Sequence, residues 1–228
     1  PVISANFQNG VHLTTAHGSL RGPKMILAAN GYSEQFGFYP NRFLHLAAHG
    51  SLTRRLTESE QQAYGVDAPW GLTPANAFAG ITMRYTNDRR ILIRQGLGYC
   101  PSQKVTPATQ QKVKRTHKQL FDARFPMLPN VEIEHTWSGI VCLSQNSAPA
   151  FGQIAPNIWT AACQNAVGVS KGTFAGTLAA DLATEQDNPL IADMFSLGEP
   201  SALPPRPFLD FGVRTRLAWE LWRNRDEA

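Results

Sequence analysis

The stretch IWTAACQNAVGVSKGTFAGTLAADL, residues 158–182, decides the fold of this chain. Its first six residues are mostly apolar and predict a buried strand, and residues 167–185 have the composition of a helix. The turn QNAV (164–167) joins the two. A strand, a tight turn and a helix N-terminus gather free backbone N–H groups and the positive end of the helix dipole. Such a place suits a phosphate or an electron-rich carbonyl oxygen.

Three glycines, Gly168, Gly172 and Gly176, are spaced four apart in the predicted helix and allow two interpretations. They belong either to a ligand-facing loop or, with Ala180, to a stripe of small residues where the helix lies close on a sheet. Each glycine inside a helix costs about 1 kcal/mol relative to alanine, which favours a packing reason. The chain has no Gly-x-Gly-x-x-Gly fingerprint, which favours packing too. The interpretations are compatible, because close packing also fixes the helix N-terminus.

Lys171 lies in the first turn of the same helix, where a cation works against the helix dipole. This placement is slightly unfavourable for stability and therefore suggests a functional role. The alternative is an ordinary lysine that faces solvent.

Residues 1–31 predict a hairpin that leads into a strand. The strand is the continuous apolar run at 24–29, which is typical of a strand buried on both faces. The turn at Gly31 then lies at the carboxyl end of this strand, where open α/β sheets place their ligands.

The middle of the chain is predicted to be antiparallel. Residues 36–75 are rich in loops, and residues 79–85 and 90–95 predict a hairpin. A helix is predicted at 107–125, with Thr106 as its N-cap. The following strand is expected to carry four alternating residues on one face: Val131, Ile133, His135 and Trp137.

The C-terminal part is predicted to be a proline-rich extended strap at 187–211 and a short helix at 213–224. That helix bears Trp219 and Trp222 beside several arginines. One interpretation is a basic surface at 212–225 that binds nucleic acid or membrane. The other is a docking helix with its tryptophans buried.

The composition indicates an ordinary globular protein of 228 residues, with 43% hydrophobic and 17% charged residues and a net charge of +4. The charge is dispersed, so we expect no nucleic-acid partner. No apolar run approaches the length of a bilayer-spanning helix, so we expect no membrane partner.

The three cysteines are unclustered and predict free thiols in a reducing compartment, the cytoplasm. The six histidines show no metal-ligand spacing, and we expect no metal site. No Gly-x-Ser-x-Gly elbow indicates a hydrolase.

An ordered set of segments resembles the C-terminal half of the D-amino-acid-oxidase-like FAD-dependent amine oxidoreductases, nearest to the bacterial γ-glutamylputrescine oxidoreductases. The segments span nearly the whole chain: PV (1–2), MILAANGYS (25–33), RYTNDRRILI (84–93), FPMLPNVEIEHTWSG (125–139), APAFGQIAPNIWTAACQNAVGVSKGTFAGTLAADL (148–182) and LPPRPF (203–208).

The resemblance implies a chain that lacks the N-terminal dinucleotide-binding half, which also accounts for a sequence that begins at Pro1. It implies backbone contact of Val2 with adenine and places Ala29 and Gly31 on the adenosine side. The turn and first helical residues would face the flavin ring with their N–H groups: Gln164, Asn165, Ala166, Val167, Gly168 and Val169. The candidate substrate-binding cations are Arg84, Arg94 and Lys171, and no catalytic residue is identified.

The chain departs from the family pattern at several places. Cys163 and Ala166 stand where the family usually has glycine, and Arg94-Gln95 stands where it has a glycine pair. Val141 replaces an arginine that holds a substrate carboxylate, which implies an amine without an adjacent carboxylate. Gly139 occupies the place of a flavin-linking cysteine, which implies non-covalent FAD.

We therefore expect an α/β (α+β) fold, a fragment of a Rossmann-like FAD-binding domain plus a largely antiparallel substrate-domain sheet. The predicted parts are residues 1–35 (FAD-binding), 36–140 (substrate-binding), 141–186 (FAD-binding) and 187–228 (strap and helix). The expected function is oxidation of an amine C–N bond to an imine. The alternatives are a non-catalytic fragment or subunit that needs a partner chain to bind FAD, or a basic-surface module. A homo-oligomer is a further possibility.

Overall fold

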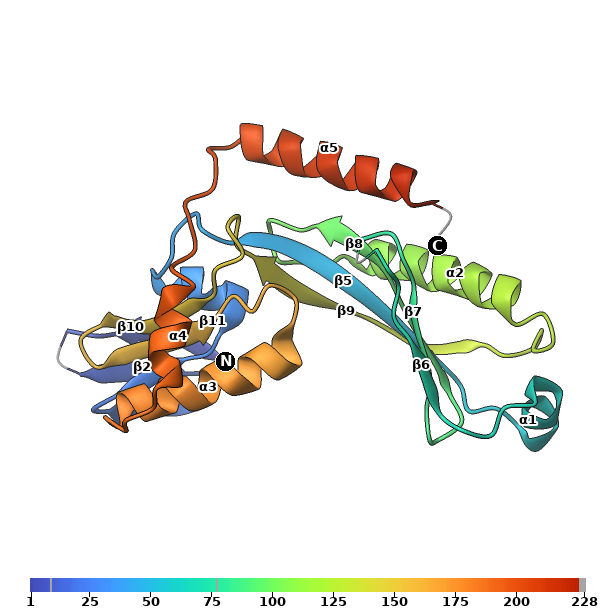
Figure 1. Cartoon of the computed structure of the whole chain (residues 1–228), viewed down its shortest axis with the longest axis horizontal. Helices are drawn as coiled ribbons and strands as arrows, with labels where there is room; N and C mark the ends of the chain where they lie inside the picture. Colours follow the sequence, from blue (N-terminus) through green and yellow to red (C-terminus); the bar gives the residue numbers. More distant parts are fainter. Residues whose placement is uncertain (9, 77, 226–228) are drawn as a thin grey trace. The chain divides into compact units, whose positions relative to one another are not determined.

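The computed structural model describes residues 1–225 except 9 and 77. The chain forms two compact units, each built from segments distant in sequence (Figure 1). Unit 1 comprises Pro1–His45 and Val141–Pro204, and unit 2 comprises Leu46–Ile140 and Pro205–Ala228. The fold is the expected mixture of α-helices with largely antiparallel sheets.

Unit 1 contains two three-stranded sheets. The first is an antiparallel meander of β1 (Val2–Asn6), β2 (Val11–Thr15) and β3 (Gly18–Gly22). In the second, β11 (Ile158–Ala162) lies between β10 (Ala150–Ala155) and β4 (Met25–Leu27). The pairing of β11 with β4 is parallel, and that with β10 is antiparallel.

Strand β4 is an edge strand in this structure. Leu27 is buried, but Ile26 is 40% exposed. The prediction of a strand buried on both faces is therefore wrong for Ile26, because the described residues leave its side of the sheet partly uncovered. Beyond β4, the 3-10 helix η1 (Asn30–Phe36) begins at the expected turn.

Two helices of unit 1 pack on β10 and β11: α3 (Gly168–Ala183) and α4 (Leu190–Ser196) (Figure 1). The α4 helix was not predicted, since residues 187–211 were expected to form an extended strap. Its Met194 and Ile191 join a core cluster that includes Leu178 of α3. Burial of these side chains stabilises a helix that the surrounding prolines alone would not indicate.

Unit 2 is built on a five-stranded sheet in the order β6-β7-β8-β5-β9. The strands are β5 (Leu44–Thr53), β6 (Trp70–Leu72), β7 (Thr82–Tyr85), β8 (Ile91–Tyr99) and β9 (Ile133–Leu143). The predicted hairpin at 79–95 is confirmed as β7 and β8. The helices are α1 (Glu58–Tyr64), α2 (Pro107–Arg124) and α5 (Phe208–Arg223).

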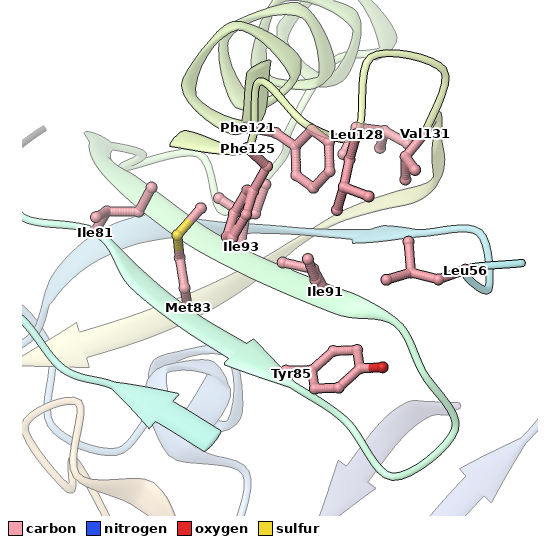
Figure 2. Close-up of a cluster of buried hydrophobic side chains, with 11 residues drawn as sticks. Leu56, Ile81, Met83, Tyr85, Ile91, Ile93, Phe121, Phe125, Leu128 and Val131 are labelled. Carbon is pink, nitrogen blue, oxygen red and sulfur yellow. The ribbon is translucent and has the colours of Figure 1, made fainter. Parts of the chain in front are cut away.

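The core of unit 2 lies between α2 and one face of this sheet (Figure 2). Ile91 and Ile93 of β8 and Met83 of β7 meet Phe121 of α2 there. The predicted helix is confirmed, with Thr106 accepting a hydrogen bond from the backbone N–H of Thr109. This packing leaves alternate residues of β7 and β8 on the opposite, open face of the sheet.

Candidate functional site

The turn after β11 is the most unusual piece of backbone in unit 1. Three of its residues adopt positive φ angles: Cys163 (53°), Asn165 (50°) and Ala166 (63°). The turn closes with a hydrogen bond of 3.0 Å from the N–H of Val167 to the carbonyl of Gln164. Left-handed backbone at non-glycine residues stores strain, and such strain concentrates at functional sites.

The side chain of Asn165 braces this turn against the loop before β10. Its Oδ1 accepts a hydrogen bond of 2.9 Å from the N–H of Ser144. Its Nδ2 donates to the carbonyls of Ser147 (3.0 Å) and Cys163 (3.2 Å). Both ends of the side-chain amide are therefore hydrogen-bonded within the protein, and only the backbone of Asn165 remains as a candidate ligand contact.

Asn30 holds the start of the turn, and the sequence analysis missed it. Its Oδ1 accepts hydrogen bonds of 3.0 Å from both the N–H of Cys163 and the thiol of Cys142. Asn30 has a φ of 50°, a conformation that asparagine tolerates well. The Asn30-Gly31 pair was the available signal, but it indicated only a turn.

The thiols of Cys142 and Cys163 lie against each other in the buried cluster beneath the turn. A hydrogen bond to Cys163, together with burial, raises the pKa of the Cys142 thiol. Cys142 therefore remains a protonated thiol at neutral pH and acts as a buried hydrogen-bond donor. All three cysteines are free, as predicted.

Helix α3 follows the turn with an uncapped N-terminus. Val167 occupies the N-cap position and provides no side-chain hydrogen bond. The first turn is open to solvent, with Val169 89% exposed. Free N–H groups and the positive dipole end thus lie at the surface of unit 1, as the sequence predicted.

The glycine stripe does not pack on the sheet. The buried face of α3 consists of Ala175, Leu178, Ala179 and Ala183. A Cβ atom added at Gly168 or Gly176 would meet nothing within 4 Å among the described residues. The packing interpretation is wrong for these two positions. Gly168 lies in the exposed first turn of α3, and Gly176 is rotated by about 80° from it, to the edge of the buried face.

A pocket of about 290 Å³ opens beside the turn. Lys171 lies on its wall, as do Gln164 and Asn165, so the structure brings these three predicted residues together. The Nε2 atom of Gln164 is buried and has no hydrogen-bond partner among the described residues. The remaining wall consists of Ser147, Pro149, Cys163, Phe174, Met194 and Leu197.

The predicted adenosine contacts fall at two places in unit 1. Val2 lines a pocket of about 200 Å³ whose walls come from β1 and from Phe7, Gln35 and Phe36. Gly31 is buried elsewhere, where an added Cβ would lie 2.9 Å from the His45 ring and 3.2 Å from the Cβ of Cys142. Ala29 directly precedes η1. Glycine is thus required at position 31 for close packing.

The two predicted arginines belong to unit 2 and lie on the open face of its sheet. Arg84 of β7 pairs with Leu92, and Arg94 of β8 pairs with Thr82, so the arginines are diagonal neighbours. Arg84 is exposed and lines a shallow hollow of about 430 Å³ beside Trp70. Burial lowers the pKa of Arg94.

The two buried histidines of unit 2 each hydrogen-bond to a serine side chain. His117 Nδ1 lies 2.7 Å from Ser51 Oγ, and its Nε2 lies 3.1 Å from the carbonyl of Gln95. His49 Nδ1 lies 2.8 Å from Ser138 Oγ. These side chains are satisfied within the core, and the described residues contain no cluster of three potential metal ligands.

A protein-family model described as DAO, FAD dependent oxidoreductase, matches residues 1–182. A curated relative, the probable oxidoreductase OrdL of Haemophilus influenzae, is 36% identical over 66 residues, which are 29% of this chain and 15% of the relative. In the part of the chain that the structure describes, no helix is long and apolar enough to cross a membrane.

Two solved structures illustrate the similarity of fold. Glycine oxidase from Geobacillus kaustophilus matches with a TM-score of 0.60 at 15% identity, covering 90% of this chain and 52% of the oxidase. Fructosyl amine: oxygen oxidoreductase (Amadoriase I) from Aspergillus fumigatus matches with a TM-score of 0.63 at 13% identity, covering 85% of this chain and 47% of that enzyme. The chain thus spans about half the length of these enzymes.

The turn and the start of α3 fit one part of an FAD molecule. Uncapped N–H groups suit an electron-rich ring edge, and the exposed side chains of Val167 and Val169 offer apolar surface beside it. The sequence contains no Gly-x-Gly-x-x-Gly loop for the pyrophosphate. The residues present therefore fit the electron-rich edge of the ring.

Proposed function

The chain belongs to the family of FAD-dependent oxidoreductases, and from this premise we propose that it supplies the substrate-binding part of an enzyme that oxidises a C–N bond. The substrate is an amine or amino-acid derivative, and the product is an imine that hydrolyses. The observation that carries the proposal is the uncapped N-terminus of α3 after a strained turn.

FAD, when bound, supplies the acceptor for the hydride that leaves the substrate carbon. The role of this chain is to hold the ring edge with backbone N–H groups of residues 164–169, other than that of Val167, which closes the turn. The positive end of the α3 dipole stabilises negative charge that accumulates there. Non-covalent FAD remains part of the proposal, since Gly139 stands where some relatives carry a linking cysteine.

The substrate class follows from the cations and from the comparisons. Arg84 and Arg94 lie on one sheet face, where they suit an acidic part of the substrate. Lys171 lies in unit 1 and is a separate candidate. Val141 favours an amine without an adjacent carboxylate, so we keep the γ-glutamylputrescine oxidoreductases as the nearest proposed relatives.

A second candidate function is a non-catalytic fragment or subunit that binds FAD only with a further FAD-binding half, in the same longer chain or in a partner. The missing pyrophosphate loop supports it. Under this proposal the 228-residue chain alone is colourless. A cytoplasmic location and a homo-oligomeric state remain proposals of the same kind.

The test uses flavin absorbance at about 450 nm, recorded on the 228-residue chain and on the complete gene product. We expect a yellow complete protein and a colourless 228-residue chain. In the complete protein, Val169→Glu should weaken FAD binding about tenfold, because a carboxylate at the α3 N-terminus competes with the ring edge.

The same substitution should leave the helix as stable as before or slightly more stable, since an acidic residue suits a helix N-terminus. Thr173→Glu, one turn further along α3 and also exposed, is the matched control and should retain FAD. A complete protein that takes up no FAD would refute the function. Equal losses in both variants would refute the role of the turn.

A further inference from the structure

Helix α5 presents an aromatic face to the outside of unit 2. Phe208, Phe211 and Trp222 are 75%, 74% and 65% exposed, and Trp219 is 38% exposed. At 3.6 residues per turn, these four positions fall on one side of the helix. The expectation of a docking helix with buried tryptophans is therefore wrong, most clearly for Trp222.

The carboxylates of α5 point the other way. Asp210 accepts a hydrogen bond of 2.5 Å from the hydroxyl of Tyr99 on β8. Glu220 is buried, and Asn224 Nδ2 donates to it at 3.1 Å. Leu209, Val213 and Leu217 share this inner side and are partly buried. The usual arrangement of an amphipathic helix, with acids outside and apolar residues inside, is thus partly inverted.

Arginines border the aromatic face. Arg216 and Arg223 lie over the Trp219 ring, with their guanidinium carbons 4.8 and 5.0 Å from its centroid. Arg214 lies on the opposite border, where its guanidinium carbon is 5.6 Å from the Tyr99 ring. Among the described residues of α5, no carboxylate lies on the outer face.

We propose that the outer face of α5 docks on an anionic phospholipid surface. Aromatic rings in the centre and cations along both borders are the pattern of helices that lie in the membrane interface. The apolar centre favours lipid over nucleic acid, whose grooves and phosphates would leave these rings without apolar partners. Helix α5 lies outside the residues that the family model matches, so this function goes beyond the oxidoreductase activity. It reverses the expectation of no membrane partner.

Co-sedimentation with phosphatidylcholine vesicles, with and without phosphatidylglycerol, tests the proposal on the complete gene product. We expect binding only to the anionic vesicles, with a blue shift of tryptophan emission and weaker binding at high salt. Phe211→Ser with Trp222→Ser should lower the partition coefficient about tenfold or more. Arg214→Gln with Arg223→Gln should lower it about tenfold.

Control variants remove exposed apolar side chains and exposed charges elsewhere on the chain. Leu20→Ser with Leu72→Ser removes two exposed leucines, and Lys112→Gln with Arg115→Gln removes two exposed charges of α2. Both controls should bind like the unaltered chain, and far-UV circular dichroism confirms that every variant folds.

Three outcomes overturn the proposal. One is no binding to anionic vesicles, and another is equal loss in the controls. The third is a different occupant of this face, seen when the protein does not bind vesicles. The protein would then either self-associate in a way that Phe211→Ser with Trp222→Ser abolishes, or bind duplex DNA.

Discussion

The backbone of individual residues marks the candidate site. Asn30, Cys163, Asn165 and Ala166 all adopt left-handed φ angles near one another in unit 1. Asparagine tolerates this region, whereas cysteine and alanine meet steric cost there. Cys163 and Ala166 are also the positions where the resembling family carries glycine, so the departures seen in the sequence fall where the backbone favours glycine.

Replacement of Ala166 by glycine should stabilise the chain. The residue is exposed and has a φ of 63°, so glycine removes strain without removing a buried contact. We expect the free energy of unfolding to rise by about 0.5–1 kcal/mol, measured by urea denaturation. Ala180→Gly, at an exposed position inside α3, is the control and should lower it by about 1 kcal/mol. Destabilisation by both substitutions would contradict the assigned strain.

The buried histidines of unit 2 should make stability depend on pH. Burial lowers the pKa of His117 and of His49 below the ordinary value of 6.5. As the pH falls through 6.5, the unfolded chain takes up protons that the folded chain does not, so the free energy of unfolding decreases. This stability is present above pH 6.5 and is lost toward the lower folded pKa values.

Urea denaturation at a series of pH values between about 7.5 and 5.5 measures this loss. His117→Gln should make the free energy of unfolding less dependent on pH. It should also lower the stability at neutral pH, because it disturbs the hydrogen bond to Ser51. The exposed His17 provides the control substitution. An unchanged slope in His117→Gln would show that another group governs the pH dependence.

At the scale of elements, apolar periodicity predicted those whose buried faces repeat regularly. Helix α2 begins at Pro107 as expected, and β7, β8 and β11 lie where their apolar runs predict. Strand β9 does not bury alternate residues along its whole length. Ile133 is buried, but His135 and Trp137 are exposed, and Thr136 instead contacts Ser51. The expectation of one continuous face is therefore wrong, since the inner side of β9 changes along its length.

The open glycine positions of α3 lead to a prediction at this scale. Gly176 lies inside the helix, and an added Cβ would meet nothing within 4 Å. Gly176→Ala should raise the free energy of unfolding by about 1 kcal/mol, measured by urea denaturation. Ala179→Gly, in the buried face, should lower it by at least that amount. A loss of stability in Gly176→Ala would restore the packing interpretation.

At the scale of the whole molecule, each of the two units consists of separate segments of the chain. Local patterns predicted several of the strands and helices within them. The short helices α1 and α4 were missed, because they depend on the Thr57 capping box and on contacts of Ile191 and Met194 rather than on long apolar periodicity.

The sequence by itself determined the family, the α/β character, the strand-turn-helix at 158–183 and the absence of a dinucleotide fingerprint. These depend on residue identity and local spacing. Only the tertiary structure decided that Asn30 anchors the turn, that Gly168 and Gly176 make no close packing contact, and that the aromatic side of α5 faces outward. Each of these depends on which distant segment lies opposite, and spacing within one segment carries no information about that.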